Sequence, residues 1–357
     1  MVRSAAEIGL GLDAMREALA EAIVSRHHQV HPELEARYGQ RGRQKCREDA
    51  SFHLSYLAQS LVAHEPKLFR EYVAWAKVML AGRGIAAREL RDNLQITAEV
   101  LTDRLPAEDA STACRYIQAA IGELSNMPST PPSGMPPDEP FSQLARSYLA
   151  ALLACQRHVA SQMILDAVRD GTSIQNVYMH VFQPSQQEIG RLWQINQITV
   201  AQEHYCSAVT QLIMSQLYPQ IFAGPRIGRK FLAAGIGGDL HEIGIRMVAD
   251  FFEMGQWDTV FLGTNVPSAD LIRTIQDRKP DVVGISATIT PHIGKVASVI
   301  AALRATPDCR EVIILVGGHP FNVAPNLWKQ IHADGAPRDA AGSVELANQL
   351  IAKRVTG

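Results

Sequence analysis

The feature that most constrains this chain is the stretch Gly237 to Gly244, which contains the pattern Asp-x-His-x-x-Gly. The residues before it, 231–236, form a short apolar run stopped by glycines, which predicts a buried strand. The residues after it, 245–252, carry apolar side chains at helical spacing and predict a helix. A histidine between a parallel strand and the next helix lies at the carboxyl edge of the sheet, where open α/β folds bind ligands.

The residue types in this stretch favour a metal ligand at His241. Asp239 stands two residues earlier, where its carboxylate can accept a hydrogen bond from one imidazole nitrogen. That bond would fix the tautomer and make the other nitrogen a better ligand. Gly244 allows the backbone to come close to a bulky group.

Two later stretches extend the pattern. Ser286-Ala287-Thr288 follows the apolar run 281–285, and Gly317-Gly318 follows the apolar run 312–316. Their order and separations suit three successive strand–helix units. Taken together, the three stretches resemble the base-off, His-on cobalamin-binding domains over roughly residues 230–347. Without that resemblance, an ordinary polar loop and an ordinary turn of a flavodoxin-like domain would also account for them.

The resemblance implies a Rossmann-like (flavodoxin-like) fold with cobalt bound to His241 and Asp239 behind the imidazole. It implies that Ser286 bonds the dimethylbenzimidazole tail and that the glycine pair leaves room for it. The residues expected to line the cofactor are Asp239, Leu240, Glu242, Ile243, Gly244, Ser286, Thr288, Gly317 and Gly318.

Composition excludes several other classes. The 357 residues allow two or three domains, and 46% of them are hydrophobic. The net charge of −2 gives no basic surplus for binding nucleic acid, and no apolar run could span a bilayer. The first twenty residues lack a signal-peptide pattern, and the five cysteines have no metal or redox spacing. We therefore expect a cytoplasmic protein with reduced thiols and no membrane or nucleic-acid partner.

The order of patterns predicts an α/β plus all-α chain. We expect a helical N-terminal domain over residues 1–126 and a proline-rich linker over 127–140. A four-helix cap should follow over 141–224, with helices at 174–181 and 184–193 and a last helix from Val200. The cobalamin-binding domain should occupy 225–357. Thr199-Val200-Ala201-Gln202 has the form of a capping box, so Thr199 should be the N-cap.

A second set of residues lies in the expected cap. Trp193 is followed ten residues later by Glu203-His204. These residues and their neighbours resemble the cap of CarH-type light sensors. The resemblance implies that Trp193 packs against an adenosyl group and that Glu203 takes its ribose hydroxyls. Read singly, Trp193 could be a core residue and Glu203 an acid that suits a helix N-terminus.

The chain departs from those sensors in one position. They carry a histidine directly after the tryptophan, which binds cobalt once the adenosyl group has left. Here that position is Gln194. His204 would be the substitute ligand, and otherwise water would take the site.

The N-terminal domain has one unusual stretch, the basic, glycine-broken residues 37–47 before His53. A solvated loop and a hydrogen-bonded core histidine would explain it. The alternative is a pocket for a flat acidic pigment, with Arg41 on its carboxylates and His53 or His64 near its rings. The architecture resembles the photocobilins, which combine a cobalamin domain with a biliverdin-binding domain. A DNA reader ranks last, because no helix-turn-helix pattern is present.

These patterns predict an adenosylcobalamin-dependent photoreceptor rather than an enzyme. Light would cleave the cobalt–carbon bond and change the conformation of the cap and the oligomeric state, with biliverdin as a second chromophore. The partners would be other copies of the chain and a downstream protein not identified by the sequence. The alternative is a corrinoid methyl carrier of a methyltransferase system. A third class, a mutase subunit or cobalamin chaperone, predicts that a partner enzyme co-purifies.

Overall fold

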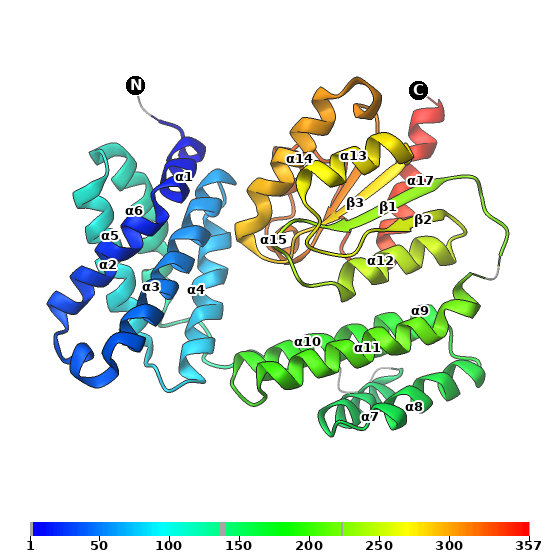
Figure 1. Ribbon diagram of the computed structural model, residues 1–357, viewed down its shortest axis with the longest axis horizontal. Coiled ribbons are helices and arrows are strands. Elements are labelled where there is room, and N and C mark those ends of the chain that lie inside the picture. Colours follow the sequence, from blue (N-terminus) through cyan, green and yellow to red (C-terminus); the bar gives the residue numbers. More distant parts are fainter. Residues whose placement is uncertain (1–2, 136–139, 223, 357) are drawn as a thin grey trace. The chain divides into compact units, whose positions relative to one another are not determined.

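The computed structural model describes residues 3–135, 140–222 and 224–356 (Figure 1). These fall into two compact units. Unit 1 contains the chain up to residue 129 together with residues 287–298 and 319–331, and unit 2 contains residues 130–286, 299–318 and the chain from residue 332 onward. Residues 136–139 of the expected linker lie outside the described residues.

The N-terminal part of unit 1 is helical throughout, as expected from its apolar periodicity. Gly82 follows the last residue of the fourth helix, where the sequence predicts a stop. The helices are α1 (Ala5–Ala14), α2 (Arg16–Val30), α3 (Glu33–Val62), α4 (Pro66–Ala81), α5 (Ala87–Arg104) and α6 (Ala107–Glu123).

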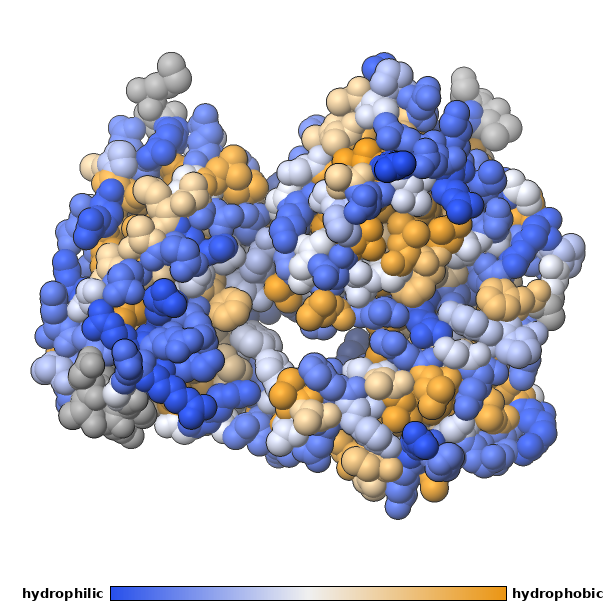
Figure 2. Space-filling view, in the orientation of Figure 1, coloured by the Kyte–Doolittle hydropathy of each residue, from blue (hydrophilic) through white to orange (hydrophobic). Residues whose placement is uncertain are grey.

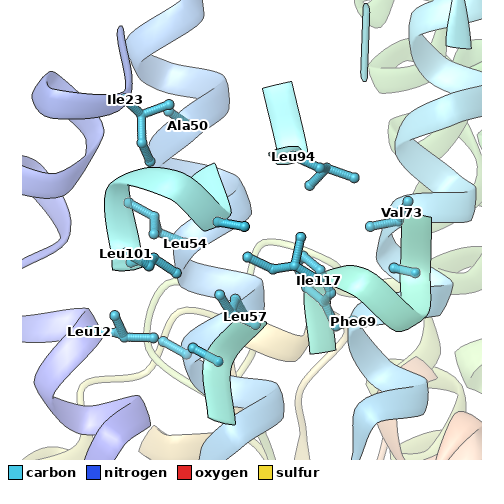
Figure 3. Close-up of a cluster of buried hydrophobic side chains, with 14 of the residues drawn as sticks. Leu12, Ile23, Ala50, Leu54, Leu57, Phe69, Val73, Leu94, Leu101 and Ile117 are labelled. Carbon is cyan, nitrogen blue, oxygen red and sulfur yellow. The ribbon is translucent and has the colours of Figure 1, made fainter. Parts of the chain in front are cut away.

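These helices enclose one apolar core, part of which is drawn in Figure 3. Helix α3 places side chains four and seven residues apart on one stripe, and α4, α5 and α6 supply the facing side chains. Burial of this cluster holds the helices together (Leu54, Leu57, Leu61, Phe69, Val73, Leu94, Leu101 and Ile117).

The basic stretch 37–47 is not the loop that its glycines suggest. It belongs to α3, and the helix is interrupted only at Gly39, whose φ of 57° lies in the left-handed region. Glycine adopts that conformation without a Cβ clash, so one residue absorbs the kink. The arginines, glutamines and lysine that follow are good helix formers, and the helix resumes.

Unit 1 also takes in two segments from later in the chain. They contain a single turn, η2 (Thr290–His292), and the short helices α15 (His319–Val323) and α16 (Leu327–Gln330). The side-chain oxygen of Gln59 in α3 accepts a hydrogen bond from the backbone N–H of Gly294 at 3.0 Å. Gln59 thereby satisfies one of the unpaired amides at the start of α14.

Unit 2 contains a parallel sheet of four strands among its described residues. They are β1 (Lys230–Gly235), β2 (Asp258–Phe261), β3 (Val282–Ser286) and β4 (Ile313–Gly317), in the order β2-β1-β3-β4. The expected Rossmann-like sheet is confirmed. Strand β2 has no strong sequence signal because it is a partly exposed edge strand. Figure 2 shows hydrophobic side chains gathered over this edge, between α12 and α13.

Helices cover both faces of the sheet (Figure 1). Helices α12 (Ile243–Met254) and α17 (Ala340–Thr356) lie on one face, and α13 (Ser268–Arg278) and α14 (Ile293–Ala305) lie on the other. Right-handed crossovers explain this arrangement. The connection from β1 to β2 runs in one direction across the sheet, and those from β2 to β3 and from β3 to β4 run in the other. The helices in these connections therefore lie on opposite faces. One side of α12 packs on the sheet through Phe252, and another packs on the preceding helices through Phe251.

Those preceding helices form the bundle that the sequence predicts as a cap. The bundle consists of α7 (Ser142–Leu153), α8 (Arg157–Arg169), a continuous helical stretch from 174 to 194, and α11 (Val200–Ile221). The two separate helices expected at 174–181 and 184–193 are joined, and that prediction is wrong. The π-helix η1 (Tyr178–Phe182) connects α9 (Ile174–Val177) to α10 (Gln183–Gln194), and Pro184, which has no N–H to donate, lies directly after this change in the hydrogen-bond pattern.

Among the described residues, no helix is both long enough and apolar enough to cross a membrane.

Candidate functional site

His241 and Asp239 form the hydrogen-bonded pair that their spacing predicts. The Nδ1 atom of His241 lies 2.8 Å from Asp239 Oδ1, and the backbone N–H of His241 donates to the same oxygen at 3.0 Å. The Asp239 side chain is 1% exposed and that of His241 is 63% exposed. A buried carboxylate thus holds one ring nitrogen, which leaves Nε2 as the atom available to a ligand.

A tight turn after β1 produces this geometry. Asp239 N–H donates to Ile236 O at 3.0 Å, and Gly238 has a φ of 93°, which only glycine adopts readily. The backbone N–H of Gly238 also donates to Asn265 Oδ1 at 2.7 Å. Asn265 was not among the residues expected from the sequence. Its only signal is the Gly-Thr-Asn-Val-Pro turn that follows the edge strand.

The surroundings of His241 alter its proton affinity. The hydrogen bond to Asp239 raises the pKa of His241, burial lowers it, and the negative charges of Asp239 and Glu203 raise it further. The contribution of Glu203 is informative, because this residue comes from the first turn of α11 and not from the sheet. Among the causes of the raised pKa of His241, the charge of Glu203 is the smallest.

Three strand ends line up at the carboxyl edge of the sheet. Ser286 is the register partner of Gly235 on β1 and of Gly317 on β4. The backbone N–H of Ile236 donates to Ser286 O at 3.0 Å. A Cβ placed on Gly317 or on Gly244 would meet no other atom within 4 Å, so both glycines border open space. The carboxyl edge of the sheet is therefore not filled next to these two glycines.

The remaining predicted residues of this part take varied positions. Leu240 is 76% exposed beside His241, Glu242 is the residue before α12, and Ile243 is half-buried against the bundle. Gly318 has a φ of 114°, a conformation that requires glycine. Thr288 belongs to unit 1 and is half-buried.

The bundle supplies the second group of predicted residues. Trp193 lies in the last turn of α10, half-buried against the bundle core. The capping box at Thr199 is confirmed, since its hydroxyl accepts from Gln202 N–H and the Gln202 side chain accepts from Thr199 N–H. Glu203 Oε2 lies 2.6 Å from His204 Nδ1, and the side chains of Glu203 and His204 are 29% and 75% exposed.

Gln194 is buried in the structure, with 8% of it exposed. The residue that replaces the histidine of the CarH-type pattern is therefore not presented to the site as a ligand. The His204 ring is exposed, and its Nδ1 atom is paired with Glu203.

A buried contact joins the bundle to α12. The Tyr178 hydroxyl donates to Asp250 Oδ2 at 2.8 Å, and both residues are buried. Burial is the main reason that the pKa of Asp250 is raised from 3.8 to about 6. Neither residue belongs to a motif, so this contact is not predictable from the sequence.

The N-terminal candidates are not brought together. The His53 ring is buried in the core of unit 1, its Nδ1 atom lies 2.8 Å from the Tyr72 hydroxyl, and burial lowers its pKa to about 4. Arg41 is exposed and lies three turns earlier on α3, and His64 is exposed beyond the end of that helix. The expected pocket shared by Arg41 and His53 is therefore not formed by this arrangement, and His53 has the hydrogen-bonded core position of the simpler alternative.

Two segments of the chain match known domain families. Residues 229–345 match a family model described as B12 binding domain, and residues 144–218 match a second model with the same description. The α/β part and the bundle are thus both B12-binding domains, and a cobalamin cofactor is supported.

Curated relatives share parts of this region. A corrinoid protein of Desulfitobacterium hafniense is 29% identical over 35% of this chain and 56% of its own length. The dimethylamine corrinoid protein of Methanosarcina barkeri is 28% identical over 39% of this chain and 64% of its own length. The transcriptional repressor CarA of Myxococcus xanthus is 32% identical over 34% of this chain and 41% of its own length. The chain spans about half to two thirds of the length of the two corrinoid proteins.

Among solved structures, the monomethylamine corrinoid protein of Methanosarcina barkeri superposes with a TM-score of 0.54 at 17% identity. The match covers 59% of this chain and all of that protein. At this identity it shows the shared fold of bundle and parallel sheet.

Proposed function

We propose that this protein is an adenosylcobalamin-dependent photoreceptor. The observation that carries the proposal is that the bundle, which holds Trp193 and Glu203 ten residues apart, packs on α12, the helix that begins two residues after His241. His241 and Asp239 come from the loop after β1, and Ile243 at the start of α12 packs against the same bundle core as Trp193. The bundle fold is shared with a solved corrinoid protein, so the feature that favours a sensor is the CarH-type resemblance of Trp193, Glu203 and His204.

The donor set fits a corrin better than a bare metal ion. A metal that is already held by a macrocycle needs one axial imidazole, as haem proteins show. Nε2 of His241 is available for this role, and the buried Asp239 carboxylate raises the basicity of the ring through Nδ1. The open space beside Gly244 and Gly317 would take parts of the corrin and its tail.

Each residue then has a defined role. His241 would bind cobalt, Asp239 would fix the tautomer, and Trp193 would exclude water from the other side. Glu203 would accept hydrogen bonds from hydroxyl groups of the upper ligand. When bound, adenosylcobalamin would supply a cobalt–carbon bond that light breaks. His204 would be close enough in sequence to Glu203 to take the site afterwards, since Gln194 is buried.

The output would be structural and not catalytic. Without an upper ligand, Glu203 and Trp193 would lack the contacts proposed for them, which would favour a different conformation of the bundle. A surface of the bundle would then be gained or lost for contact with another copy of the chain. A light-dependent homo-oligomer, read by a downstream protein, is the proposed signal.

The second candidate is a corrinoid methyl carrier, and the names of the curated relatives favour it over the first. Such a protein would share His241, Asp239 and Ser286. The two functions differ in the upper ligand, which carries hydroxyl groups in one case and is a methyl group in the other. Only the first would use Glu203 to accept hydrogen bonds from the upper ligand.

Biliverdin is proposed for unit 1 by architecture alone. His53 is buried against Tyr72, so a pigment would have to displace this contact. Mixing the protein with biliverdin should give a red-absorbing complex that His53→Ala weakens. An unchanged absorption spectrum on mixing removes biliverdin from the proposal.

The main experiment compares oligomeric state in the dark and after light. Free adenosylcobalamin is itself light-sensitive, so bleaching is not a sufficient measurement. When protein loaded with adenosylcobalamin in the dark is illuminated, its molar mass measured by light scattering should change. Glu203→Gln should reduce this change. Loading with methylcobalamin provides the control. An oligomeric state that ignores light, in a protein that binds both cobalamins, would favour the methyl carrier.

A further inference from the structure

A chain of polar side chains runs from Glu203 into the centre of the bundle. Ser207 Oγ lies 3.0 Å from Glu203 Oε1 and 3.3 Å from Gln186 Oε1. Gln186 Nε2 donates to Thr210 Oγ1 at 2.8 Å, and the Tyr148 hydroxyl lies 2.8 Å from the same oxygen. Helices α7, α10 and α11 each contribute to it. Thr210 and Tyr148 are fully buried, so the inner end of this chain is shielded from water.

The direction of the inner hydrogen bonds follows from counting protons. Thr210 donates its one hydroxyl proton to Cys206 O at 2.9 Å. Its oxygen must therefore accept from both the Tyr148 hydroxyl and the Gln186 amide. Burial raises the pKa of Tyr148, so its hydroxyl keeps the proton that it donates. Because the Gln186 amide NH₂ is committed to Thr210, its carbonyl oxygen faces Ser207.

Ser207 then has one proton and two acceptors. A hydroxyl group donates a single hydrogen bond, so Ser207 serves either Glu203 or Gln186 at any moment. When it serves Glu203, both carboxylate oxygens are held, because His204 Nδ1 lies 2.6 Å from the other one. When it serves Gln186, Glu203 loses one restraint and the buried amide oxygen gains a partner. In the first state the Glu203 carboxylate is held by two hydrogen bonds. In the second state the buried Gln186 amide oxygen has a hydrogen-bond partner instead.

We propose that Ser207 is a positioning residue that selects for an upper ligand with hydroxyl groups and links its presence to the packing of the bundle. The inference rests on the proposed function, since it takes Glu203 as the residue that meets the upper ligand. An upper ligand that donates hydrogen bonds to Glu203 binds best when Ser207 already holds the carboxylate in place. A methyl group has no hydrogen-bond donor, so its binding does not depend on Ser207.

Affinity for two cobalamins tests this. The full-length protein is titrated in the dark with adenosylcobalamin and with methylcobalamin, and Kd is measured by quenching of tryptophan fluorescence. Ser207→Ala should raise Kd for adenosylcobalamin about tenfold, in line with one hydrogen bond to a charged group, and should change Kd for methylcobalamin less than about twofold. Ser207→Thr retains the hydroxyl and should restore the wild-type ratio. Ser161→Ala, which removes a hydroxyl bonded to Gln216 on another part of the bundle, is the matched control.

A second variant distinguishes the loss of the Ser207 hydrogen bond from a general loss of packing in the bundle. Gln186→Met removes the competing acceptor, so Ser207 can serve only Glu203. Its Kd for adenosylcobalamin should stay at the wild-type value or fall, although it perturbs the same network. An equal loss of affinity for both cobalamins in Ser207→Ala, or a loss in Gln186→Met like that in Ser207→Ala, overturns the inference.

The outcome is separable from that of the proposed function. If the wild type binds both cobalamins but ignores light, the photoreceptor proposal fails and the Kd ratio still decides the role of Ser207. If the wild type binds neither cobalamin, both proposals fail.

Discussion

His241 and Glu203 both act at the candidate site, but the protein holds them in different ways. His241 is held by a residue two positions away, a buried carboxylate inside one turn. Glu203 is held by His204 and Ser207 of its own helix α11, and Ser207 has a competing acceptor, Gln186, on α10. A restraint without a competitor, as at His241, gives a fixed ligand. A restraint that competes with an acceptor on a neighbouring helix can respond to what is bound, because it changes whenever the two helices move.

The strongest way to break this comparison is His241→Ala. If the imidazole is the fixed ligand, its loss should weaken cobalamin binding by more than about 100-fold, since losing only a supporting residue of a metal ligand typically costs about 10- to 100-fold. The absorption spectrum of any cobalamin still bound should lose the features of axial histidine. Equilibrium dialysis and absorption spectroscopy measure both. His158→Ala, at an exposed histidine of the bundle, should leave both unchanged.

Asp239→Asn tests the support behind the imidazole. Asparagine keeps the shape of the side chain but not its charge, so Nδ1 is held less strongly and the ring is a poorer ligand. We expect cobalamin affinity to fall about 10- to 100-fold, less than for His241→Ala. A fall of less than about twofold would show that the turn alone orients His241.

The contact between Tyr178 and Asp250 connects the two halves of the comparison, since one residue lies in the bundle and the other in α12. The folded protein raises the pKa of Asp250 from 3.8 to about 6, so it binds a proton more tightly than the unfolded chain. Stability should therefore fall as pH rises from about 4 to about 6, by on the order of 1–3 kcal/mol.

Chemical denaturation of wild type and Asp250→Asn across that pH range measures the effect. The variant cannot ionise at this position and should lose this part of the pH dependence. Asp308→Asn, at an exposed carboxylate, should keep the wild-type slope. Parallel curves for wild type and Asp250→Asn would contradict the assignment.

Thr199→Ala should have the smallest effect of these variants, and it tests whether the N-cap of α11 helps to position Glu203. Loss of the N-cap of α11 should cost about 1 kcal/mol and lower Tm by a few degrees. Because Glu203 lies in the first turn after this cap, affinity for adenosylcobalamin should also fall slightly. Ser173→Ala removes the N-cap of α9 in the same bundle and should lower Tm without this loss of affinity.

The sequence predicts best what is encoded within a few residues. The Asp239–His241 contact and the Thr199 capping box follow from spacings of two and three, and both are present. The three buried strands are continuous apolar runs, and their ends place Gly235, Ser286 and Gly317 in one row.

What the sequence does not predict depends on tertiary packing. Edge strand β2 is short and half-exposed, and its apolar residues Val260 and Phe261 form too short a run to mark it. Gln186, Ser207 and Thr210 are ordinary polar residues until α10 and α11 pack together. The basic stretch in α3 misleads for the opposite reason, since a single Gly39 kink leaves the rest of a glycine-containing segment helical. Arg41 and His53 are both distinctive in sequence, yet one faces solvent and the other faces the core.

Helix α12 connects the loop that carries His241 to the bundle that carries Glu203. It starts two residues after His241 and runs for 12 residues, about 18 Å at the rise of an α-helix. Its Phe252 is packed on the sheet and its Phe251 on the bundle, so the helix cannot yield to one side without losing contacts on the other. A displacement of the bundle would therefore act on α12 as well, and His241, just ahead of the first turn of that helix, would move with it.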